Sequence, residues 1–374
     1  MAHLRQGVAY VSAKLLATMS FANTPAPAPN PAPAASPHLS VRPQWLALQP
    51  EDALEPDLPI IDAHHHLWDH VGNRYFVPDM LEDLASGHNI RATVAVECHA
   101  MYKRSAPTPL QPVGEVEFLN GSAAITASGN YGACQIAAGI VGHADLLLGA
   151  KVEPVLQALN QAGGGRLRGL RYSAVWHPDP AARGSLANPP PQVMSDARFR
   201  EGFAQLAPRG LSFDAWIYHT QIAELFDLAQ HFPETTIVLD HCGGVIGIGP
   251  YAGRRDAVRE EWAADLRQLA RCPNVYLKLG GLGMRLYGFE LGSQPRPPSS
   301  QELATLWQPY VQTCIEFFGA DRCMFESNFP VDKGSCSYGV LWNAYKRMSS
   351  GASAAEKQAL FSGTAARVYR LSLD

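Results

Sequence analysis

Residues 60–70, IIDAHHHLWDH, place four histidines and two aspartates directly after an apolar run. His64 and His66 are separated by one residue, so their side chains share a face if this stretch is an extended strand. Neutral imidazoles in that arrangement bind a metal such as zinc, or they hydrogen-bond a substrate directly. The same alternation predicts that Asp62 shares the face of His64 and His66, and that His65 points the other way.

Further ionisable and polar side chains follow other apolar runs along the chain. They are Glu97, His99, Arg171, Asp214, Tyr218, His219, Asp240, His241, Lys278, Glu326 and Asn328. In a barrel of parallel strands, functional residues come from the carboxyl ends of several different strands. We therefore expect these side chains to converge on one pocket, with Trp68 as part of its wall.

The elements that must position these residues alternate regularly. Eight β-branched, apolar stretches are candidate strands, at residues 58–64, 91–99, 134–142, 166–172, 211–218, 235–241, 274–281 and 322–329. Helical patterns cover residues 114–128, 152–161, 196–206, 221–231, 256–270, 301–318 and 354–369. This alternation predicts parallel βαβ units, and the count of eight strands favours a single-domain (β/α)8 TIM barrel over an open sheet.

The connecting segments and the N-terminus differ in composition from these elements. Residues 72–89, 100–112, 176–192 and 286–300 are rich in proline, glycine and aromatic residues, and loops of this length are often lids or binding loops. The first 40 residues contain a Pro/Ala tract, which we expect to be a flexible tail before one domain at residues 41–374.

Composition narrows the class of protein. The chain has 374 residues, 47% of them hydrophobic, and a net charge of −4. A basic run is missing, which argues against nucleic-acid binding, and the chain lacks the roughly 20-residue apolar stretch of a membrane span. Seven scattered cysteines without a CxxC motif favour reduced thiols in a cytoplasmic protein.

Three motifs carry a family resemblance. DAHHHLW at residues 62–68, LDHCG at 239–243 and RCMFESNFP at 322–330, in this order, resemble the amidohydrolase-related family. Within it, they resemble the branch of metal-dependent TIM-barrel hydrolases that includes lactonases of sugar acids and of pyrone dicarboxylate. The resemblance covers roughly residues 45–374. It implies a TIM barrel that hydrolyses an ester, lactone or amide, although some members are decarboxylases or hydratases.

The resemblance also implies a set of metal ligands. They are His64, His66, His219 and His241. One divalent, zinc-like cation with an open coordination position is therefore one alternative. Some lactonases of the branch are thought to work without metal, and in that alternative the histidines hydrogen-bond the substrate directly. Both alternatives stay open at this point.

The sequence departs from the family pattern at residue 328. Asn328 stands where the family has an aspartate that accepts a proton from the attacking water, and an amide has no useful basicity. Another group must then be the general base, and the candidates are Glu326, Asp332, Glu97 or one of the histidines. Glu326 is the first choice, because burial can raise the pKa of a carboxyl group beside a site.

The remaining polar residues are candidates for substrate binding. Arg171 offers a planar guanidinium that can clamp a carboxylate or a carbonyl. The other candidates are Glu97, His99, Asp214, Tyr218, Lys278 and Trp68. The alternative for the charged ones is internal ion pairing, of Glu97 with Lys278 or Arg171, and of Arg171 with Asp214.

The sequence thus predicts a hydrolase that opens a lactone or ester of a small organic acid, with or without an aromatic portion. Two alternatives remain: a metal-dependent non-oxidative decarboxylase, and a barrel that has lost catalysis and binds a metabolite. The replacement at Asn328 is the feature that favours the last of these. We expect a small-molecule substrate, and leave open whether the chain forms a homo-oligomer.

Overall fold

Eight parallel strands form one sheet in the computed structural model, which describes residues 38–70, 73–185, 187 and 189–372. In the order of their pairing the strands are β1 (Ile60–His65), β4 (Ile90–Val96), β5 (Gln135–Gly142), β6 (Leu167–Ser173), β7 (Ser212–Trp216), β8 (Ile237–Leu239), β9 (Val275–Leu279) and β10 (Cys323–Phe325). Each strand overlaps one of the stretches predicted from the sequence.

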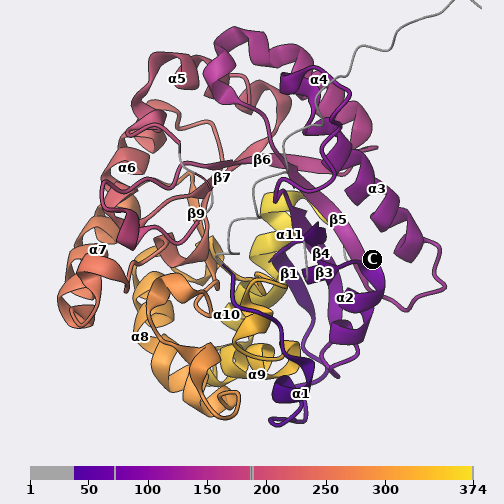
Figure 1. Cartoon of the computed structure of the whole chain (residues 1–374), viewed down its shortest axis with the longest axis vertical. Helices are drawn as coiled ribbons and strands as arrows, with labels where there is room; N and C mark the ends of the chain where they lie inside the picture. Colours follow the sequence, from indigo (N-terminus) through magenta and orange to yellow (C-terminus); the bar gives the residue numbers. More distant parts are fainter. Residues whose placement is uncertain (1–37, 71–72, 186, 188, 373–374) are drawn as a thin grey trace, which may run out of the picture. The chain divides into compact units, whose positions relative to one another are not determined.

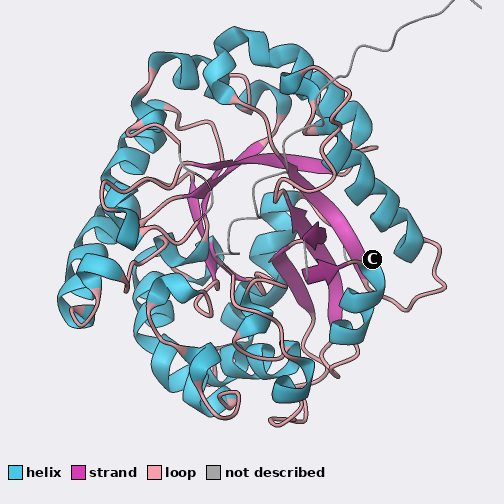
Figure 2. Cartoon of the chain, in the orientation of Figure 1, coloured by secondary structure: helices cyan, strands magenta, loops and turns pink. Residues whose placement is uncertain are grey.

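The sheet closes between its first and last strands. Beyond β10, the backbone N–H of Asn328 donates to the carbonyl of His64 at 2.8 Å, and that of His66 donates to the carbonyl of Phe329 at 2.7 Å. These bonds continue the parallel pattern, so the ring of strands in Figure 2 is a nearly closed barrel. The predicted TIM barrel is therefore confirmed.

Most of the helices lie outside the ring of strands (Figure 1). They are α1 (Pro43–Leu46), α2 (Val77–Leu84), α3 (Val113–Ala127), α4 (Glu153–Ala162), α5 (Ala197–Phe203), α6 (Ile222–His231), α7 (Arg255–Leu269), α8 (Ser300–Phe318), α9 (Tyr338–Met348), α10 (Ala354–Gln358) and α11 (Thr364–Tyr369). Among the described residues, no helix combines the length and apolarity needed to cross a membrane.

The helix α2 lies in a stretch that the sequence predicted to be a loop. Its first turn contains Pro78, which has no N–H to leave unpaired, and Asp79, whose carboxylate accepts from the N–H of Phe76 at 2.8 Å. Val77 and Met80 are buried against the barrel. The eight residues of α2 are too few to show a clear helical period, so a proline-containing stretch was read as a loop.

A separate apolar cluster fills the amino-terminal half of the barrel interior. Ile61 of β1 and Ala92 of β4 pack there with Val368 and Tyr369 of the C-terminal helix. In Figure 1, α11 (yellow) lies within the outline of the strand ring. Because α11 covers this end of the interior, the carboxyl ends of the strands are left to form the pocket.

One face assignment in β1 was wrong. The pairing of β1 with β4 shifts its register between Asp62 and His65, which marks a bulge. The Asp62 carboxylate accepts from the N–H of Ser327 at 2.8 Å and from the hydroxyl of Tyr338 at 3.0 Å, so it does not share the face of His64. Its burial raises the pKa of Asp62 to about 6. His65 points away, as predicted, toward the Thr93 hydroxyl.

Candidate active site

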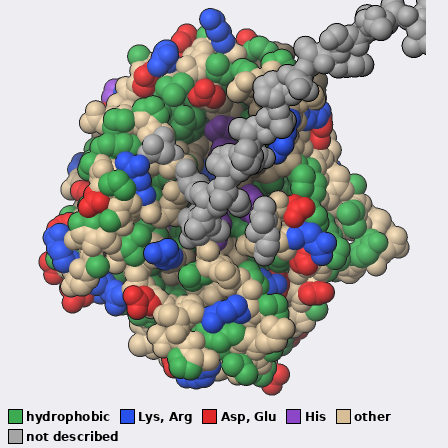
Figure 3. Space-filling model, in the orientation of Figure 1, with side chains coloured by type: hydrophobic (Ala, Val, Ile, Leu, Met, Phe, Trp, Pro, Cys, Tyr) green, Lys and Arg blue, Asp and Glu red, His purple; other side chains and the backbone are tan. Residues whose placement is uncertain are grey.

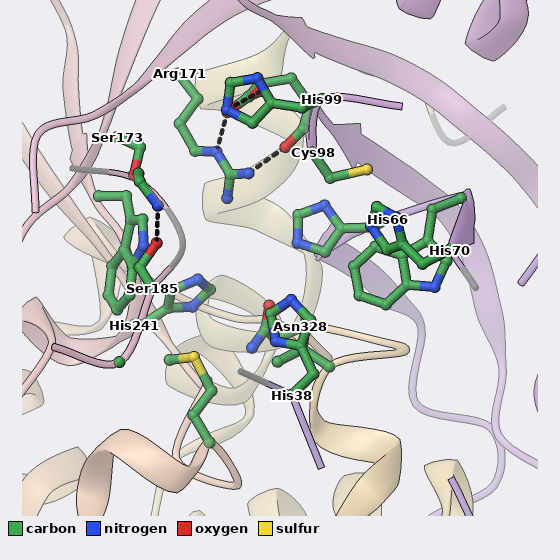
Figure 4. A pocket seen from close by; sticks show the side chains of 17 residues that line it. His38, His66, His70, Cys98, His99, Arg171, Ser173, Ser185, His241 and Asn328 are labelled. Atoms are coloured by element: carbon green, nitrogen blue, oxygen red, sulfur yellow. Dashed lines mark hydrogen bonds and ion pairs between the residues drawn. The ribbon is translucent and has the colours of Figure 1, made fainter. Parts of the chain in front are cut away.

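The carboxyl ends of the strands enclose a cavity of about 500 Å³, a size typical of small-molecule sites. Residues predicted for the site that line it are His66, Trp68, Glu97, His99, Arg171, His241 and Asn328. Figure 4 shows most of these side chains from close by, and Figure 3 shows histidines at the centre of this face. Arg171 belongs to β6, His66 directly follows β1, and Trp68 begins the short strand β2 (Trp68–His70). The others come from the segments after β4, β8 and β10.

A carboxylate connects two of the site histidines. Glu326 Oε1 lies 2.6 Å from His241 Nδ1, and Glu326 Oε2 lies 3.0 Å from His64 Nδ1. Burial raises the pKa of Glu326, but His241 and His64 have the larger, opposite effect, so the pKa lies at about 2, below its usual value. The expected raised pKa is therefore wrong, because two imidazoles lie against the carboxylate. Glu326 contacts both rings but does not line the cavity, so it is not placed to act as a base.

The third histidine is fixed from its own Nδ1. His66 Nδ1 lies 2.8 Å from the carbonyl oxygen of Val96, which can only accept, so Nδ1 carries the proton and Nε2 a lone pair. His66 Nε2 is 3.2 Å from His64 Nε2. Burial lowers the pKa of both rings well below the usual value, helped by Lys278 for His64 and by Arg171 for His66. Both imidazoles are neutral near pH 7.

This arrangement suits a metal site. His66 and His241 each turn Nδ1 toward an acceptor and leave Nε2 for a ligand, as in proteins whose metal-binding histidines are oriented by a carboxylate or carbonyl. His64 Nδ1 lies 3.0 Å from Glu326 Oε2 and 3.2 Å from Lys278 Nζ. His64, Asp240 and His241 also offer donor atoms that lie within 4.8 Å of one another.

The structure does not bring His219 into this cluster. Its Nδ1 accepts from the backbone N–H of Ile246 at 3.2 Å, and its ring centroid lies 5.2 Å from that of Tyr251. Burial lowers the pKa of His219 to about 4, so the ring is neutral and its proton is on Nε2. That tautomer has no free lone pair for a metal. Its ligand role, implied by the family resemblance, gains no support from this placement.

Arg171 and Glu97 form a buried pair on the pocket wall. Arg171 Nε donates to Glu97 Oε1 at 2.8 Å, Nη2 donates to the Glu97 carbonyl, and Nη1 lies 3.4 Å from His64 Nε2. Burial raises the pKa of Glu97, but Arg171 and then His99 lower it below its usual value. Glu97 Oε2 has no hydrogen-bond partner among the described residues. Of the alternative pairings, the structure shows Glu97 with Arg171.

Lys278 and Asp214 lie deeper, away from the pocket wall. Lys278 Nζ lies 2.6 Å from Asp214 Oδ2, 3.0 Å from Asp240 Oδ1 and 3.2 Å from His64 Nδ1. Burial lowers the pKa of Lys278, but Asp214 and Asp240 raise it above the usual value. Lys278 and Asp214 are fully buried and do not line the cavity, so Lys278 acts on the site through His64, and Asp214 acts through Lys278.

Tyr218, the remaining predicted substrate-binding residue, does not line the cavity but contacts a loop that does. Its hydroxyl accepts from the backbone N–H of Gly184 at 2.9 Å. Gly184 and Ser185 line the cavity, and they belong to the segment 176–192 that was predicted to be a binding loop. Tyr218 therefore positions this loop.

Asn328 and Asp332 are joined beside the cavity. Asn328 Nδ2 donates to Asp332 Oδ1 at 2.9 Å, and the N–H of Gly283 donates to Asp332 Oδ2 at 2.8 Å. Burial raises the pKa of Asp332 to about 7. Both oxygens of Asp332 are thus engaged, and it lies behind Asn328 rather than on the cavity wall.

Sequence reasoning missed Glu115 and His38. Glu115 Oε1 accepts from the N–H of Cys98 at 2.8 Å and of Ala100 at 3.0 Å, and so holds the turn that carries His99. Burial and the charge of Glu97 raise its pKa to about 8. The only signal was an acid within an otherwise apolar helix face. His38 lines the cavity, although it follows a Pro/Ala tract that gave no signal.

Fold and site together define a barrel of the amidohydrolase class, with imidazoles gathered at the carboxyl ends of its strands. The model of the Amidohydrolase family matches residues 61–371, and the chain belongs to this family.

Several known proteins resemble it along most of its length. The uncharacterised protein y4mH of Sinorhizobium fredii is 34% identical over 84% of this chain and 99% of its own. An L-fucono-1,5-lactonase of Burkholderia multivorans is 27% identical over 83% of this chain and 96% of its own. A crystal structure of a Burkholderia multivorans amidohydrolase with bound zinc is 26% identical, with a TM-score of 0.64 over 84% of this chain and 99% of its own. Likeness to a 5-carboxyvanillate decarboxylase, at 10% identity, shows the fold alone.

Proposed function

We propose that this protein hydrolyses a lactone or ester of a small organic acid, by attack of water on a carbonyl held at the histidine cluster. The observation that carries this proposal is Glu326 between His64 and His241, which fixes both rings by Nδ1 and leaves Nε2 for a ligand. The lactonase name of the Burkholderia relative supports this reaction class.

One divalent cation is the cofactor that the residues fit. His64, His66 and His241 would hold it through Nε2. Within the part of the chain that the structure describes, the buried carboxylates Glu97, Asp214, Asp240 and Glu326 lie near two buried cations, Arg171 and Lys278. Burying such an excess of negative charge is costly unless a cation accompanies it. When bound, such a cation polarises a carbonyl and lowers the pKa of water.

The chain's own groups supply the remaining chemistry. Arg171 presents a permanent positive charge to the cavity, where it stabilises the negative charge that develops on the carbonyl oxygen. Among the carboxylates considered as base, Glu97 lines the cavity, and its Oε2 makes no hydrogen bond to a described residue and lies 3.9 Å from His99 Nε2. Glu97 therefore takes a proton from water as the water oxygen bonds to the carbonyl carbon. It returns that proton to the alcohol oxygen as the C–O bond breaks.

A substrate screen tests the proposal. Sugar-acid lactones, aryl esters and hydroxybenzoates are each incubated with the purified full-length chain, with and without a chelator. Acid release from a lactone or ester supports hydrolysis. Release of carbon dioxide from a hydroxybenzoate would replace it with decarboxylation, and saturable binding without turnover would replace it with metabolite binding. The cytoplasmic setting inferred from the scattered cysteines stays a prediction.

A further inference from the structure

The segment His38–Leu46, here called the N-terminal strap, precedes the residues that match the family model, yet it reaches the cavity. The His38 ring lies 5.3 Å from that of Trp68 and nearly parallel to it, at 17°. The Trp68 ring in turn lies 5.6 Å from that of His66, at 8°. Through Trp68, the strap is in packing contact with a site histidine. Figure 4 shows His38 among the side chains of the cavity.

Two hydrogen bonds anchor the strap to the segment 286–300. Arg42 Nη2 donates to the carbonyl of Gly292 at 2.5 Å, and Trp45 Nε1 donates to that of Gln294 at 3.0 Å. The Arg42 guanidinium also lies 4.0 Å over the Trp45 ring. These contacts hold the strap along a segment that the sequence predicted to be a lid or binding loop.

A close backbone approach seats the strap beside the active site. A Cβ placed on Gly334 would lie 2.5 Å from Leu39 Cβ and 2.8 Å from the Leu39 carbonyl oxygen. Both distances are shorter than real Cβ contacts, so a side chain at residue 334 must displace Leu39. Gly334 lies two residues after Asp332, in the segment that also carries Asn328. The seating of Leu39 therefore fixes where His38 enters the cavity.

The His38 ring has the chemistry of a neutral hydrogen-bonding group. Burial, followed by the nearby charges of His70 and Arg171, lowers the pKa of His38 to about 4. A neutral imidazole donates at one nitrogen and accepts at the other, which suits a hydroxyl group better than a second cation.

We propose that His38 contacts the substrate, at a hydroxyl group or other neutral polar group, and that the N-terminal strap completes the wall of the binding pocket. This inference rests on the proposed hydrolytic function for its substrate. It assigns a recognition role to residues that lie outside the part of the chain shared with the family model.

Four variants of the full chain test it by steady-state kinetics on the best lactone or ester. His38→Ala removes the ring, and His38→Phe keeps a ring against Trp68 but removes both nitrogens. Gly334→Ala leaves His38 intact but displaces Leu39. Gly351→Ala is the matched control, because a Cβ at Gly351 would meet no atom of the described residues within 4 Å.

We expect the first three variants to raise KM about tenfold, as for a lost hydrogen bond, with kcat changed less than about threefold. Gly351→Ala should leave both constants unchanged. Unchanged KM in His38→Ala and His38→Phe would overturn the substrate contact, and this readout stands even if Gly334→Ala fails to fold.

Hydrogen exchange separates failure of this inference from failure of the proposed function. Absence of any lactone or ester turnover by the wild-type chain would refute the proposed hydrolysis. The strap is then tested by the exchange of its backbone amides, which should be faster in Gly334→Ala than in wild type or Gly351→Ala. Equal exchange in all three proteins would overturn the seating of the strap, whatever reaction the site performs.

Discussion

The Nε2 atoms of His64 and His66 lie 3.2 Å apart, with neither ring free to turn away from the other. His66 is held by the carbonyl of Val96 and His64 by Glu326. Two nitrogens bound at about 2.0–2.1 Å to one tetrahedral zinc would lie about 3.3–3.4 Å apart. The separation in the structure is therefore close to that of two ligands sharing one metal ion.

This geometry predicts that the protein binds a metal ion. We expect protein purified without chelators to carry about one divalent metal ion per chain by elemental analysis, and His66→Ala to lose most of it. The exposed His231 of α6 provides the control, since His231→Ala should retain the metal. Full activity of metal-free wild-type protein would instead favour direct hydrogen bonding of the substrate by the histidines.

Glu326→Gln should disable the site without removing any histidine. A glutamine oxygen can accept from one ring, but its NH₂ group then faces the N–H of the other. We expect metal affinity to fall about 10–100-fold and kcat/KM to fall by a similar factor or more. Metal titration and kinetics check this, with Glu260→Gln on the exposed face of α7 as control. Wild-type metal affinity in Glu326→Gln would show that the carboxylate does not orient the rings.

The pH profile identifies the base. A base works when deprotonated, so the rate falls as pH falls through its pKa. Because the pKa of Glu97 is lowered, kcat/KM should show no acid limb between pH 5 and 8. If Asp332 were the base, the rate would instead fall near its pKa of about 7. Glu97→Gln should lower kcat more than about 100-fold, and an acid limb near pH 7 would count against Glu97.

Restoring the family's aspartate at residue 328 should create a conflict that a second change relieves. Asn328→Asp replaces a donor to Asp332 with a second carboxyl group, so repulsion should reduce stability at pH 8 by about 1–3 kcal/mol. The double variant Asn328→Asp with Asp332→Asn restores a donor–acceptor pair and should recover most of the loss. Urea unfolding of the wild type, both single variants and the double variant measures this coupling, and additive effects would refute it.

Replacing Glu115 with glutamine should stabilise the protein, and the gain should depend on pH. The pKa of Glu115 is raised to about 8 in the folded protein, against an ordinary value of 4.5, so the folded state is penalised increasingly as pH rises from 4.5 to 8. Glu115→Gln removes that penalty and keeps an oxygen for the N–H groups of Cys98 and Ala100. Its free energy of unfolding should exceed that of wild type by about 1 kcal/mol or more at pH 8, with a smaller gain at pH 5. A gain that is equal at both pH values would refute the assignment.

Local pattern was sufficient to predict the barrel and part of its site. The eight strands were found from runs of β-branched and apolar residues, because side chains alternate along any extended strand. The positions of His66, Arg171 and His241 followed from the rule that parallel strands end at one face of a barrel. The rule of alternating faces gave the wrong face for Asp62. The reason is a bulge in β1, which depends on the pairing with β4 and cannot be recognised in the local sequence.

The sequence by itself determined the family, the order of the strands, and that His66 and His241 come near the pocket, since these depend on residue types and on period. Only the tertiary structure decided what each side chain does there. Glu326 lies between two imidazole rings, Asp332 lies behind Asn328, and His38 lines the cavity from outside the segment that matches the family. Protonation and hydrogen bonding depend on neighbours brought together from distant parts of the chain, and no local pattern records those neighbours.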